Sequence, residues 1–402
     1  MIPKQGKSTF GGKRMERGNE RFEYQFGHPP THGAFAPGRI NLIGEHIDYN
    51  GGHVFPCAIT FGTYAFARRR NDRRFLLYSE NFPESGIQEF SLDNLSYNPR
   101  HGWANYPKGM VKAFLDRGYP VDSGAELLFY GNIPNGAGLS SSASIEMATG
   151  VLLSSLFDFP VDRIELARIG QHVENHFIGV NCGIMDPFAV AMAKTGQGIL
   201  LQCDTLEYEY VPIPLEGYNI VIMNTNKRRE LAGSKYNERR RECEEALAAL
   251  RKRTTLHHLA ELSVEAFESL QSAITDPVIR KRARHVVYEN ERTMLAKKAL
   301  IRGDLRKFGR YLNESHISLR DDYEVTGKEL DVIVEAAWNQ PGVAGARMTG
   351  AGFGGCAIAI VKKEAIPSFV DRVGQEYREK TGLEADFYPV MIGEGARELF
   401  RQ

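Results

Sequence analysis

Residues 36–52 hold side chains that could bind a polar ligand. The segment reads Ala36-Pro37-Gly38-Arg39-Ile40-Asn41-Leu42-Ile43-Gly44-Glu45-His46-Ile47-Asp48-Tyr49-Asn50-Gly51-Gly52. Its charged and imidazole groups belong to Arg39, Glu45, His46 and Asp48. An apolar run at 40–43 between glycine-containing turns predicts a strand that leads into a loop. Charges in loops are usually only solvated, but a loop held between glycines favours recognition of hydroxyl or phosphate groups.

A second run, from Gly131 to Ser144, is rich in glycine and serine and joins an expected strand to an expected helix. Small residues let the backbone approach an anion closely, and the N-terminal end of a helix favours negative charge. The serines can cap the helix or reach a metal ion. A plain turn with a helix cap is the alternative. The run is not a Walker A loop, because no lysine follows Gly136 in the Gly-Lys-Ser/Thr arrangement.

A third glycine cluster, Gly350–Gly355, satisfies the pattern G-x-G-x-x-G. A dinucleotide-binding loop must open a helix. Here the following residues, 356–361, are β-like, and no acidic residue about 20 positions on ends a second strand. We therefore reject a Rossmann site and expect a strand–loop–strand unit.

Asp186 is a single carboxylate in the apolar sequence Cys182-Gly183-Ile184-Met185-Asp186-Pro187-Phe188. Such a position is costly for a charge unless something pairs with it. An isolated Asp-Pro would be interpreted as a helix cap. Next to the other motifs we favour catalysis, with Arg39 as the cation that pairs with Asp186. Whether Asp186 removes a proton or only orients a hydroxyl stays open.

Glu174 lies between His172 and His176 on an expected helix. Two histidines at i and i+4 would suit zinc, but the zincin pattern needs a glutamate directly after the first histidine. Glu174 is two residues on, so we reject zinc.

The elements that must position these residues alternate along the chain. The expected strands are Thr63–Arg68, Arg74–Ser79, Glu126–Tyr130, Gly198–Gln202, Tyr218–Met223, Ala344–Met348, Cys356–Val361 and Asp386–Pro389. The expected helices are Asn105–Leu115, Ser141–Phe157, Asp162–Phe177, Tyr236–Arg251, Leu256–Leu270, Asp276–Lys298, Asp304–Ser315, Lys328–Trp338 and Glu364–Lys380. Charged amphipathic helices dominate after about residue 226.

Composition limits the class of protein. A chain of 402 residues favours two domains. Lys plus Arg equals Asp plus Glu at 50 each, so no overall field favours nucleic acid or acidic lipid. The longest apolar stretch, residues 356–361, is far short of the roughly 20 residues that cross a bilayer. We expect neither a nucleic-acid partner nor a membrane.

Five cysteines without Cys-x-x-Cys spacing favour reduced thiols and a cytoplasmic location. Residues 1–21 carry basic side chains with no apolar core behind them, so we expect no secretory signal but a polar, disordered leader.

Three of these motifs together resemble galactokinases, members of the GHMP family of small-molecule kinases. The segment 36–52 resembles the sugar signature. Pro134–Ser142 matches Pro-x-x-x-Gly-Leu-Ser-Ser-Ser, and Gly350–Gly355 matches the third family motif. The resemblance spans about Phe35 to Val361. Departures are Ile47, where the family often has threonine, and Pro187, where glutamine is common.

The resemblance implies an α+β, two-domain GHMP kinase fold. The expected units are an N-terminal mixed-sheet α/β domain at 22–217, similar to domain 2 of ribosomal protein S5, and a C-terminal ferredoxin-like α+β domain at 218–402. The third glycine motif should approach the active site and stabilise the phosphate loop.

The resemblance also implies roles for individual residues. Asp186 and Arg39 would be catalytic. The sugar would be bound by Glu45, His46, Ile47, Asp48, Gly183 and Tyr236. The nucleotide would be bound by Ser79, Gly136, Ala137, Gly138, Leu139, Ser140, Ser141 and Ser142, with Trp103 and Tyr106 as further candidates for the nucleoside. Ser142 and Glu174 would hold Mg²⁺.

The function implied is ATP- and Mg²⁺-dependent phosphorylation of D-galactose at its C1 hydroxyl, in galactose metabolism, by a monomer. Two alternatives stay open. One is a kinase for N-acetylgalactosamine or a related sugar, which would need room near C2. The other is a galactose- and ATP-binding sensor without catalysis, although the intact Ser140–Ser144 run argues against it.

Overall fold

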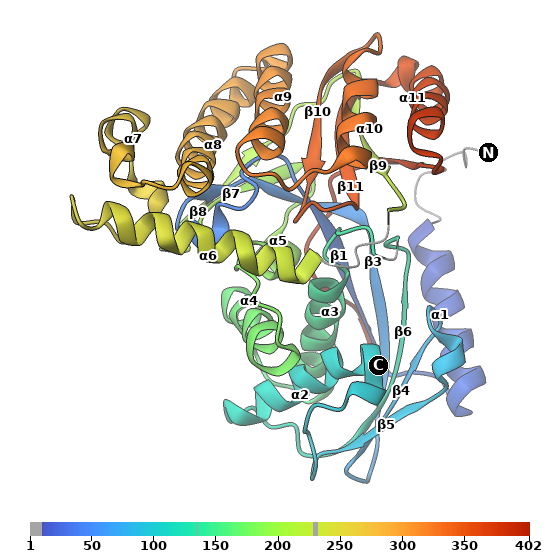
Figure 1. The fold of residues 1–402 in the computed structure, drawn as a ribbon. Helices are drawn as coiled ribbons and strands as arrows, with labels where there is room; N and C mark the ends of the chain where they lie inside the picture. Colours follow the sequence, from blue (N-terminus) through green and yellow to red (C-terminus); the bar gives the residue numbers. More distant parts are fainter. Residues whose placement is uncertain (1–9, 135, 228–231) are drawn as a thin grey trace.

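The computed structural model describes residues 10–134, 136–227 and 232–402, which form two α/β units (Figure 1). The first unit is built on a six-stranded sheet in the order β13-β1-β3-β6-β4-β5. Its strands are β1 (His32–Asn41), β3 (Pro56–Arg69), β4 (Arg74–Ser79), β5 (Gln88–Ser91), β6 (Ala125–Gly131) and β13 (Arg397–Arg401). Neighbouring strands are antiparallel, except that β4 runs parallel to β6.

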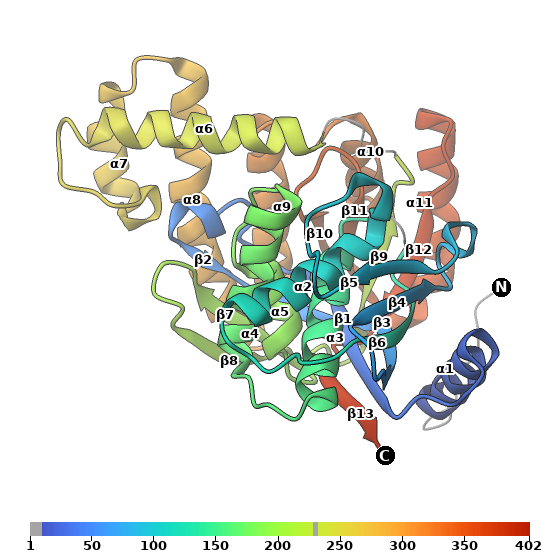
Figure 2. The same cartoon turned by 90° about the horizontal axis from the view of Figure 1, so that it is seen from below.

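Side chains alternate across this sheet, so that each face packs on different helices. On β3, Ala65 and Ala67 belong to the core beneath the helices α2 to α5. Tyr64 and Phe66 belong to a separate aromatic cluster with Phe22 of helix α1. These helices are α1 (Phe10–Phe26), α2 (Asn105–Asp116), α3 (Ser141–Leu156), α4 (Arg163–His172) and α5 (Met185–Met192). Helix α1 therefore lies on the opposite side of the sheet from α2 and α3 (Figures 1 and 2).

The expected disordered leader is wrong from Phe10 onward, because this part of it is helix α1. Phe22, just past the predicted leader, is fully buried against the sheet. A few aromatic side chains among charged ones are enough to dock an amphipathic helix. Residues 1–9 of the predicted leader lie outside the described residues.

The second unit is built on a four-stranded antiparallel sheet in the order β10-β11-β9-β12. Its strands are β9 (Tyr218–Asn224), β10 (Val343–Thr349), β11 (Cys356–Lys362) and β12 (Asp386–Val390). The helices α10 (Lys328–Trp338) and α11 (Ile366–Thr381) cover one face. The other face packs against α8 (Pro277–Ile301) and α9 (Leu305–Asp321).

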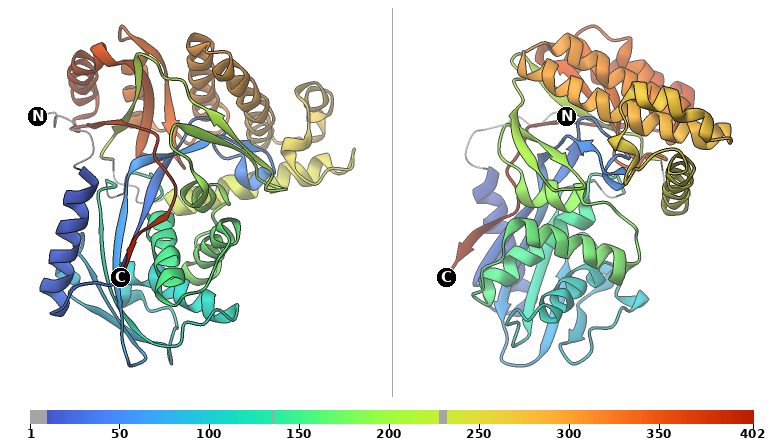
Figure 3. Two further views of the ribbon diagram at one scale, coloured as in Figure 1. Left: turned by 180° about the vertical axis from the view of Figure 1, so that it is seen from behind. Right: turned by 90° about the vertical axis from the view of Figure 1, so that its left-hand side faces the viewer.

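The remaining elements flank the two units. Helices α6 (Ala232–Leu250) and α7 (Val264–Leu270) lie beside α8, and together with α9 they form the helical part that Figure 3 shows from two sides. A small third sheet joins β2 (His53–Val54), β7 (Gln197–Gln202) and β8 (Tyr208–Pro212). Short helical turns occur at Asp48–Asn50, Pro83–Ser85, Pro99–Ala104, Val173–Ile178, Leu259–Glu261, Gln271–Ala273 and Lys363–Ala365.

The predicted helix Leu256–Leu270 is wrong in its first half. That half contains only the short turn Leu259–Glu261, and α7 begins after Ser263, whose hydroxyl accepts the Ala266 N–H. A serine that caps a helix start favours a break at this position. The other predicted strands and helices correspond to elements of the structure, but some ends differ more widely. Strand β3 begins at Pro56 rather than Thr63, α9 continues to Asp321 rather than Ser315, and the predicted helix Asp162–Phe177 comprises α4 and the turn Val173–Ile178. The strand predicted at residues 40–43 is only the end of β1, which stops at Asn41.

The C-terminal end of the chain crosses back to the first unit. Strand β9 begins at Tyr218, directly after the predicted boundary at 217. However, β13 pairs with β1 of the first sheet, and Ile392 forms a bridge to Ile59 of β3. The predicted C-terminal domain 218–402 is therefore wrong for its last residues. Within the described ranges, none of the helices combines the length and apolar character needed to cross a membrane.

The end of β1 connects the two units. Ile40, Leu42 and Ile43 are fully buried in a core that they share with Ile358 of β11 and Phe308 of α9. The segment that carries the charged residues of 36–52 therefore leaves the first sheet and enters the contact between the units. Its apolar side chains therefore pack against residues of both units.

Candidate active site

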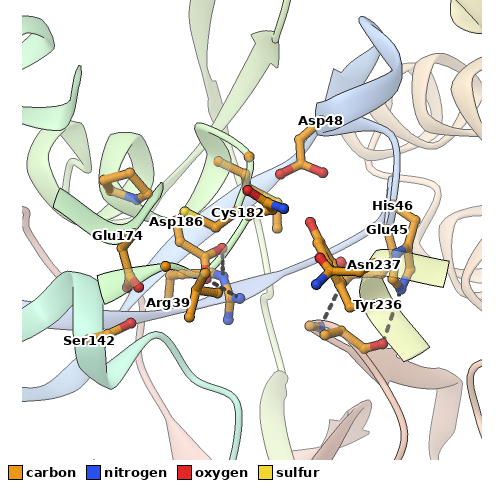
Figure 4. Close-up of a pocket in the computed structure, with 18 of the residues that line it drawn as sticks. Arg39, Glu45, His46, Asp48, Ser142, Glu174, Cys182, Asp186, Tyr236 and Asn237 are labelled. Carbon is orange, nitrogen blue, oxygen red and sulfur yellow. Dashed lines mark hydrogen bonds and ion pairs between the residues drawn. The ribbon is translucent and has the colours of Figure 1, made fainter. Parts of the chain in front are cut away.

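Arg39 and Asp186 form a bidentate ion pair at the centre of the site (Figure 4). The Arg39 Nε and Nη2 atoms donate to the two carboxylate oxygens of Asp186, each at 2.8 Å. The third nitrogen, Nη1, donates to the carbonyl of Gly138 at 2.9 Å. Such a fork-to-fork pair fixes orientation as well as charge. Burial lowers the pKa of Arg39, but the negative charges of Asp186 and Glu45 outweigh it and hold the pKa above its ordinary value.

Asp186 receives a further hydrogen bond from the phosphate loop. It lies in the first turn of α5, and the Ser140 hydroxyl donates to its Oδ2 atom at 2.7 Å. Ser140 has a positive φ of 62°, a left-handed conformation that non-glycine residues seldom adopt. This backbone geometry accompanies the approach of its hydroxyl to the carboxylate. With about a third of its side chain exposed, Asp186 can still meet a ligand.

The glycine- and serine-rich loop runs along β1 and leads into α3. The Arg39 N–H donates to the Leu139 carbonyl at 3.1 Å, and a Cβ at Gly38 would lie 2.7 Å from the same oxygen. Gly38 is therefore needed for this close approach. Ala137 and Leu139 are buried, and they anchor the loop in the core. Gly136 and Gly138 have positive φ angles, so the loop can turn its backbone toward a ligand.

Two cavities meet at the Arg39–Asp186 pair. One has a volume of about 340 Å³, and its lining includes Glu45, His46, Asp48, Glu174, Gly183 and Tyr236. The other, of about 530 Å³, is lined by Gly136, Gly138, Ser140, Ser141, Asn224, Asn226 and Lys227. Both cavities are also lined by Arg39, Ser142, Asp186 and Ala351. The pair therefore stands where a group could pass from a ligand in one cavity to a ligand in the other.

Glu45 is held by the third glycine loop. Its Oε1 atom accepts the Gly350 N–H at 2.8 Å and faces the Arg347 guanidinium at 3.3 Å. Burial raises the pKa of Glu45, while the charges of Arg347 and Arg39 work in the opposite direction. A Cβ at Gly350 would lie 2.9 Å from the Gly138 carbonyl. The third motif thus contacts both the 36–52 segment and the phosphate loop, as expected.

Asp48 lies under the loop that contains Gly183. A Cβ at Gly183 would lie 1.8 Å from an Asp48 carboxylate oxygen, so any side chain there would displace Asp48. Burial, together with the charges of Asp186 and Glu45, raises the pKa of Asp48 to about 7. Asp48 lacks a salt-bridge partner among the described residues. A ligand hydroxyl would be a suitable donor to this carboxylate.

His46 is a neutral imidazole whose two nitrogens already have protein partners. Its Nδ1 lies 2.7 Å from the Tyr49 hydroxyl and its Nε2 lies 3.0 Å from the Ala351 carbonyl. A carbonyl only accepts, so Nε2 carries the proton and Nδ1 accepts from Tyr49. Burial, followed by the charge of nearby His285, lowers the pKa of His46 to about 3. The ring of Tyr236 lies against His46, with 5.6 Å between the centroids.

Ser142 and Glu174 lie together at the junction of the two cavities (Figure 4). Glu174 belongs to a π-helical turn, Val173–Ile178, a geometry that is frequent at functional sites. Burial and the charge of Asp186 raise the pKa of Glu174 to about 7, although a hydrogen bond from Ser142 lowers it. A hydroxyl and a carboxylate facing a phosphate loop are oxygen ligands of the kind that Mg²⁺ prefers.

Several predicted site residues do not line either cavity. Ile47 is fully buried in the core, and Trp103 packs edge-on against Phe129. Ser79 is buried at the end of β4, where its hydroxyl accepts the Asn81 N–H. Their roles stay predictions. Tyr106, a weaker candidate for the nucleoside, instead lines the cavity that holds Glu174.

Some lining residues escaped the sequence analysis. Asn224, Asn226 and Lys227 come from the end of β9 and face the phosphate loop across the larger cavity. A polar, basic cluster directly after an apolar strand was a usable signal for them. Glu146, one turn after Ser142, is buried, and neither of its carboxyl oxygens has a hydrogen-bond partner among the described residues. Burial and the charge of Glu174 raise its pKa well above the ordinary value.

Comparison with known families matches three parts of the chain. The galactokinase galactose-binding signature covers residues 20–69. The N-terminal domain of GHMP kinases covers residues 105–194, and their C-terminal domain covers residues 296–379. The signature thus contains Arg39, Glu45 and Asp48, and the N-terminal domain contains the phosphate loop and Asp186.

Individual relatives match nearly the whole chain. The galactokinase of Enterococcus faecalis is 58% identical over 380 residues, which is 94% of this chain and 98% of the relative. That of Bacillus subtilis is 55% identical over 365 residues, covering 91% and 94% respectively. The crystal structure of Lactococcus lactis galactokinase complexed with galactose is 51% identical, with a TM-score of 0.94 and coverage of 96% and 100%.

A more distant structure shares only the fold. The mevalonate kinase of Methanococcus jannaschii is 19% identical, with a TM-score of 0.64, over 90% of this chain and 98% of that one. The two-domain α+β fold expected from the motifs is confirmed by these matches.

Proposed function

This chain belongs to the galactokinase family of GHMP kinases, and we propose that it transfers the terminal phosphoryl group of ATP to the C1 hydroxyl of D-galactose. The products are α-D-galactose 1-phosphate and ADP. One observation carries the assignment of the reacting groups: the Arg39–Asp186 pair is shared by the cavity of the sugar signature and the cavity of the phosphate loop.

In this proposal, galactose occupies the smaller cavity with its C1 hydroxyl at Asp186. The carboxylate accepts the hydroxyl hydrogen and directs the oxygen toward the second cavity. Because Asp186 already accepts hydrogen bonds from Arg39 and Ser140, its orientation is fixed. Phosphoryl transfer through a loose transition state needs positioning more than a strong base.

Arg39 supplies positive charge beside the transferring group. It is 4% exposed and anchored to the Gly138 carbonyl, so its guanidinium needs little rearrangement during the reaction. Preorganised charge in a site that excludes water is the largest contribution to catalysis in many enzymes. The backbone of Gly136–Ser142 and the N-terminal end of α3 favour the phosphates of ATP.

Sugar recognition falls to Glu45, Asp48 and Tyr236. Glu45 is anchored through Oε1, which leaves Oε2 for a sugar hydroxyl. Asp48 offers a carboxylate under the Gly183 loop. A wrong epimer would leave these carboxylate oxygens without a donor, and this cost would discriminate against it. His46 supports this pocket through Tyr49 and the Ala351 carbonyl.

Ser142 and Glu174 would hold Mg²⁺. Their oxygens are adjacent, and a divalent cation would satisfy a carboxylate that burial otherwise makes costly to ionise. When bound, the ion supplies charge that neutralises the phosphates of the nucleotide. We also propose a cytoplasmic location, where buried thiols such as Cys57 and Cys243 stay reduced.

The test is release of ADP from ATP and Mg²⁺ with galactose, glucose, N-acetylgalactosamine or no sugar. We expect release with galactose only. Release with N-acetylgalactosamine alone would change the substrate but keep the assignment of the reacting groups. Absence of release from folded protein that still binds galactose would contradict the proposal and favour a sensor.

A further inference from the structure

Arg347 is a fully buried arginine at the contact between the two units. It lies on β10, and by volume it is the largest fully buried side chain among the described residues. Burying a guanidinium is costly, and replacing a buried ion pair with apolar residues is often neutral or stabilising. A buried arginine at this position therefore suggests that Arg347 has a role besides packing in the core.

The guanidinium is directed at the segment that carries the sugar signature. Its Nη1 atom donates to the carbonyls of Asn41 at 3.0 Å and Leu42 at 3.2 Å, and to Glu45 Oε1 at 3.3 Å. Asn41 is the last residue of β1, so these contacts hold the backbone where the strand becomes the ligand loop. Thr349, two residues further along β10, also exchanges hydrogen bonds with Asn41.

A second set of contacts joins Arg347 to helices α8 and α9. Its Nε donates to the Ser315 hydroxyl at 3.1 Å, and its Nη2 lies 3.8 Å from Glu289 Oε1. Glu289 in turn accepts the Gly44 N–H at 3.1 Å, one residue before Glu45. The neighbouring Arg292 balances Glu289 from the other side. Residues 41–45, called here the sugar segment, are thus held against α8, α9 and β10 by a buried cluster of Arg347, Glu289, Arg292 and Ser315.

We propose that Arg347 is a positioning residue for sugar recognition, which holds Glu45 and the 41–45 backbone so that Glu45 Oε2 meets a sugar hydroxyl. Arg347 lines neither cavity and acts only through Glu45 and the loop. The inference rests on the proposed role of Glu45.

The geometry sets Arg347 apart from an arginine that only stabilises the fold. Three of its contacts fall on the sugar segment, whereas the phosphate loop and Asp186 are held by Arg39 and Ser140. Loss of Arg347 should therefore affect the sugar more than the nucleotide. This asymmetry can be measured.

The experiment compares Arg347→Lys and Ser315→Ala with the wild-type chain in steady-state kinetics. Lysine keeps the charge, but its single nitrogen cannot bind the Asn41 and Leu42 carbonyls and donate to the Ser315 hydroxyl at the same time, as Nη1 and Nε of Arg347 do. We expect the KM for galactose to rise by about tenfold in Arg347→Lys, and by less in Ser315→Ala, with the KM for ATP unchanged. Ser315→Ala removes one hydroxyl, which contacts both Arg347 and Glu289, and it tests the buried cluster as a whole if Arg347→Lys does not fold.

The matched control is Arg70→Lys. Arg70 pairs with Asp72 and Glu126 next to the end of β3 remote from Asn41, so its replacement loses a similar fork without touching the sugar segment. We expect both KM values to stay unchanged in this variant. Equal rises in both KM values for Arg347→Lys, or an unchanged KM for galactose in a folded variant, would overturn the proposal.

The variant Glu45→Gln tests the proposed sugar site separately from the proposed role of Arg347. If Glu45→Gln leaves the KM for galactose unchanged, the proposed sugar site is wrong. If Glu45→Gln raises it and Arg347→Lys does not, only the inference about Arg347 fails. If Arg347 acts through Glu45, adding Arg347→Lys to Glu45→Gln should raise the KM by less than it does in the wild-type background.

Discussion

At the scale of single residues, the reacting groups are fixed by short polar contacts. Asp186 accepts two hydrogen bonds from Arg39 and one from Ser140, so its orientation is set before any ligand binds. Its neighbours in sequence are apolar, and this contrast was the signal that singled it out. The pairing with Arg39 was predicted, but the hydrogen bond from Ser140 was not, because it accompanies a left-handed backbone at a non-glycine residue.

Replacing Asp186 with asparagine should abolish most turnover while sparing nucleotide binding. The amide cannot take up the hydroxyl proton, and it leaves Arg39 without its counter-charge. We expect kcat to fall by about 10²–10⁴-fold with little change in the dissociation constant of ATP. Steady-state kinetics and an ATP titration would measure both quantities. A near-normal kcat would remove Asp186 from its role.

Two serines of the same loop should give different phenotypes. Ser140→Ala loses a hydrogen bond to a charged group, and we expect kcat to fall by about tenfold with unchanged Mg²⁺ dependence. Ser142→Ala should instead raise the Mg²⁺ concentration needed for half-maximal rate. Titration of Mg²⁺ against both variants separates them. If the two titrations coincide, the assignment of Ser142 to the metal is contradicted.

The raised pKa of Glu174 predicts a pH dependence of stability without metal. In the folded protein this pKa is about 7, because of burial and then the charge of Asp186, against an ordinary value of 4.5. As pH rises, the Glu174 carboxyl therefore loses its proton at a lower pH in the unfolded chain than in the folded protein. The free energy of unfolding should decrease as pH rises from about 4.5 to 7 and level off above, by on the order of 3 kcal/mol at most.

Glu174→Gln removes this dependence and serves as the comparison. Its Tm minus that of the wild-type chain, both without Mg²⁺, should be larger at pH 8 than at pH 5. Asp48, whose pKa is also raised to about 7, contributes equally to both chains and cancels. A difference in Tm that does not change with pH would contradict the buried, proton-linked carboxylate. Differential scanning fluorimetry gives the values.

At the scale of elements, hydrophobic periodicity located most helices and strands. Two predictions were wrong for opposite reasons: the first half of the helix predicted at Leu256–Leu270, and the disordered leader where helix α1 lies. In the first case the apolar spacing was present but Ser263 caps a later start. In the second case the charged composition hid a few aromatic side chains that dock on the sheet.

Helix α1 should stabilise the fold without entering catalysis. Phe22 is fully buried against the aromatic face of the six-stranded sheet, and it lines neither cavity. We expect Phe22→Ala to lower the free energy of unfolding by about 3 kcal/mol with both KM values unchanged. Tyr24→Ala is the control, since that side chain is 85% exposed. A change in KM for Phe22→Ala would link α1 to the site.

At the scale of the whole molecule, the site exists because segments distant in sequence converge. The end of β1, the phosphate loop, α5 and the third glycine loop meet between the two units. The motif order and the rejection of a Rossmann site followed from the sequence, since the glycines of 350–355 precede a strand. The burial of Arg347 and the return of β13 to the first sheet did not, because both depend on long-range packing.

The central claim is that this chain transfers the terminal phosphoryl group of ATP to the anomeric hydroxyl of galactose, beside the Arg39–Asp186 pair. The measurement that tests it most directly is ³¹P NMR of the reaction of the wild-type chain with ATP, Mg²⁺ and galactose, with 1-deoxygalactose in a parallel tube. We predict a single sugar phosphate at C1 with galactose and no phosphorylated product with 1-deoxygalactose. A phosphate at another hydroxyl, or a product from 1-deoxygalactose, would contradict the account.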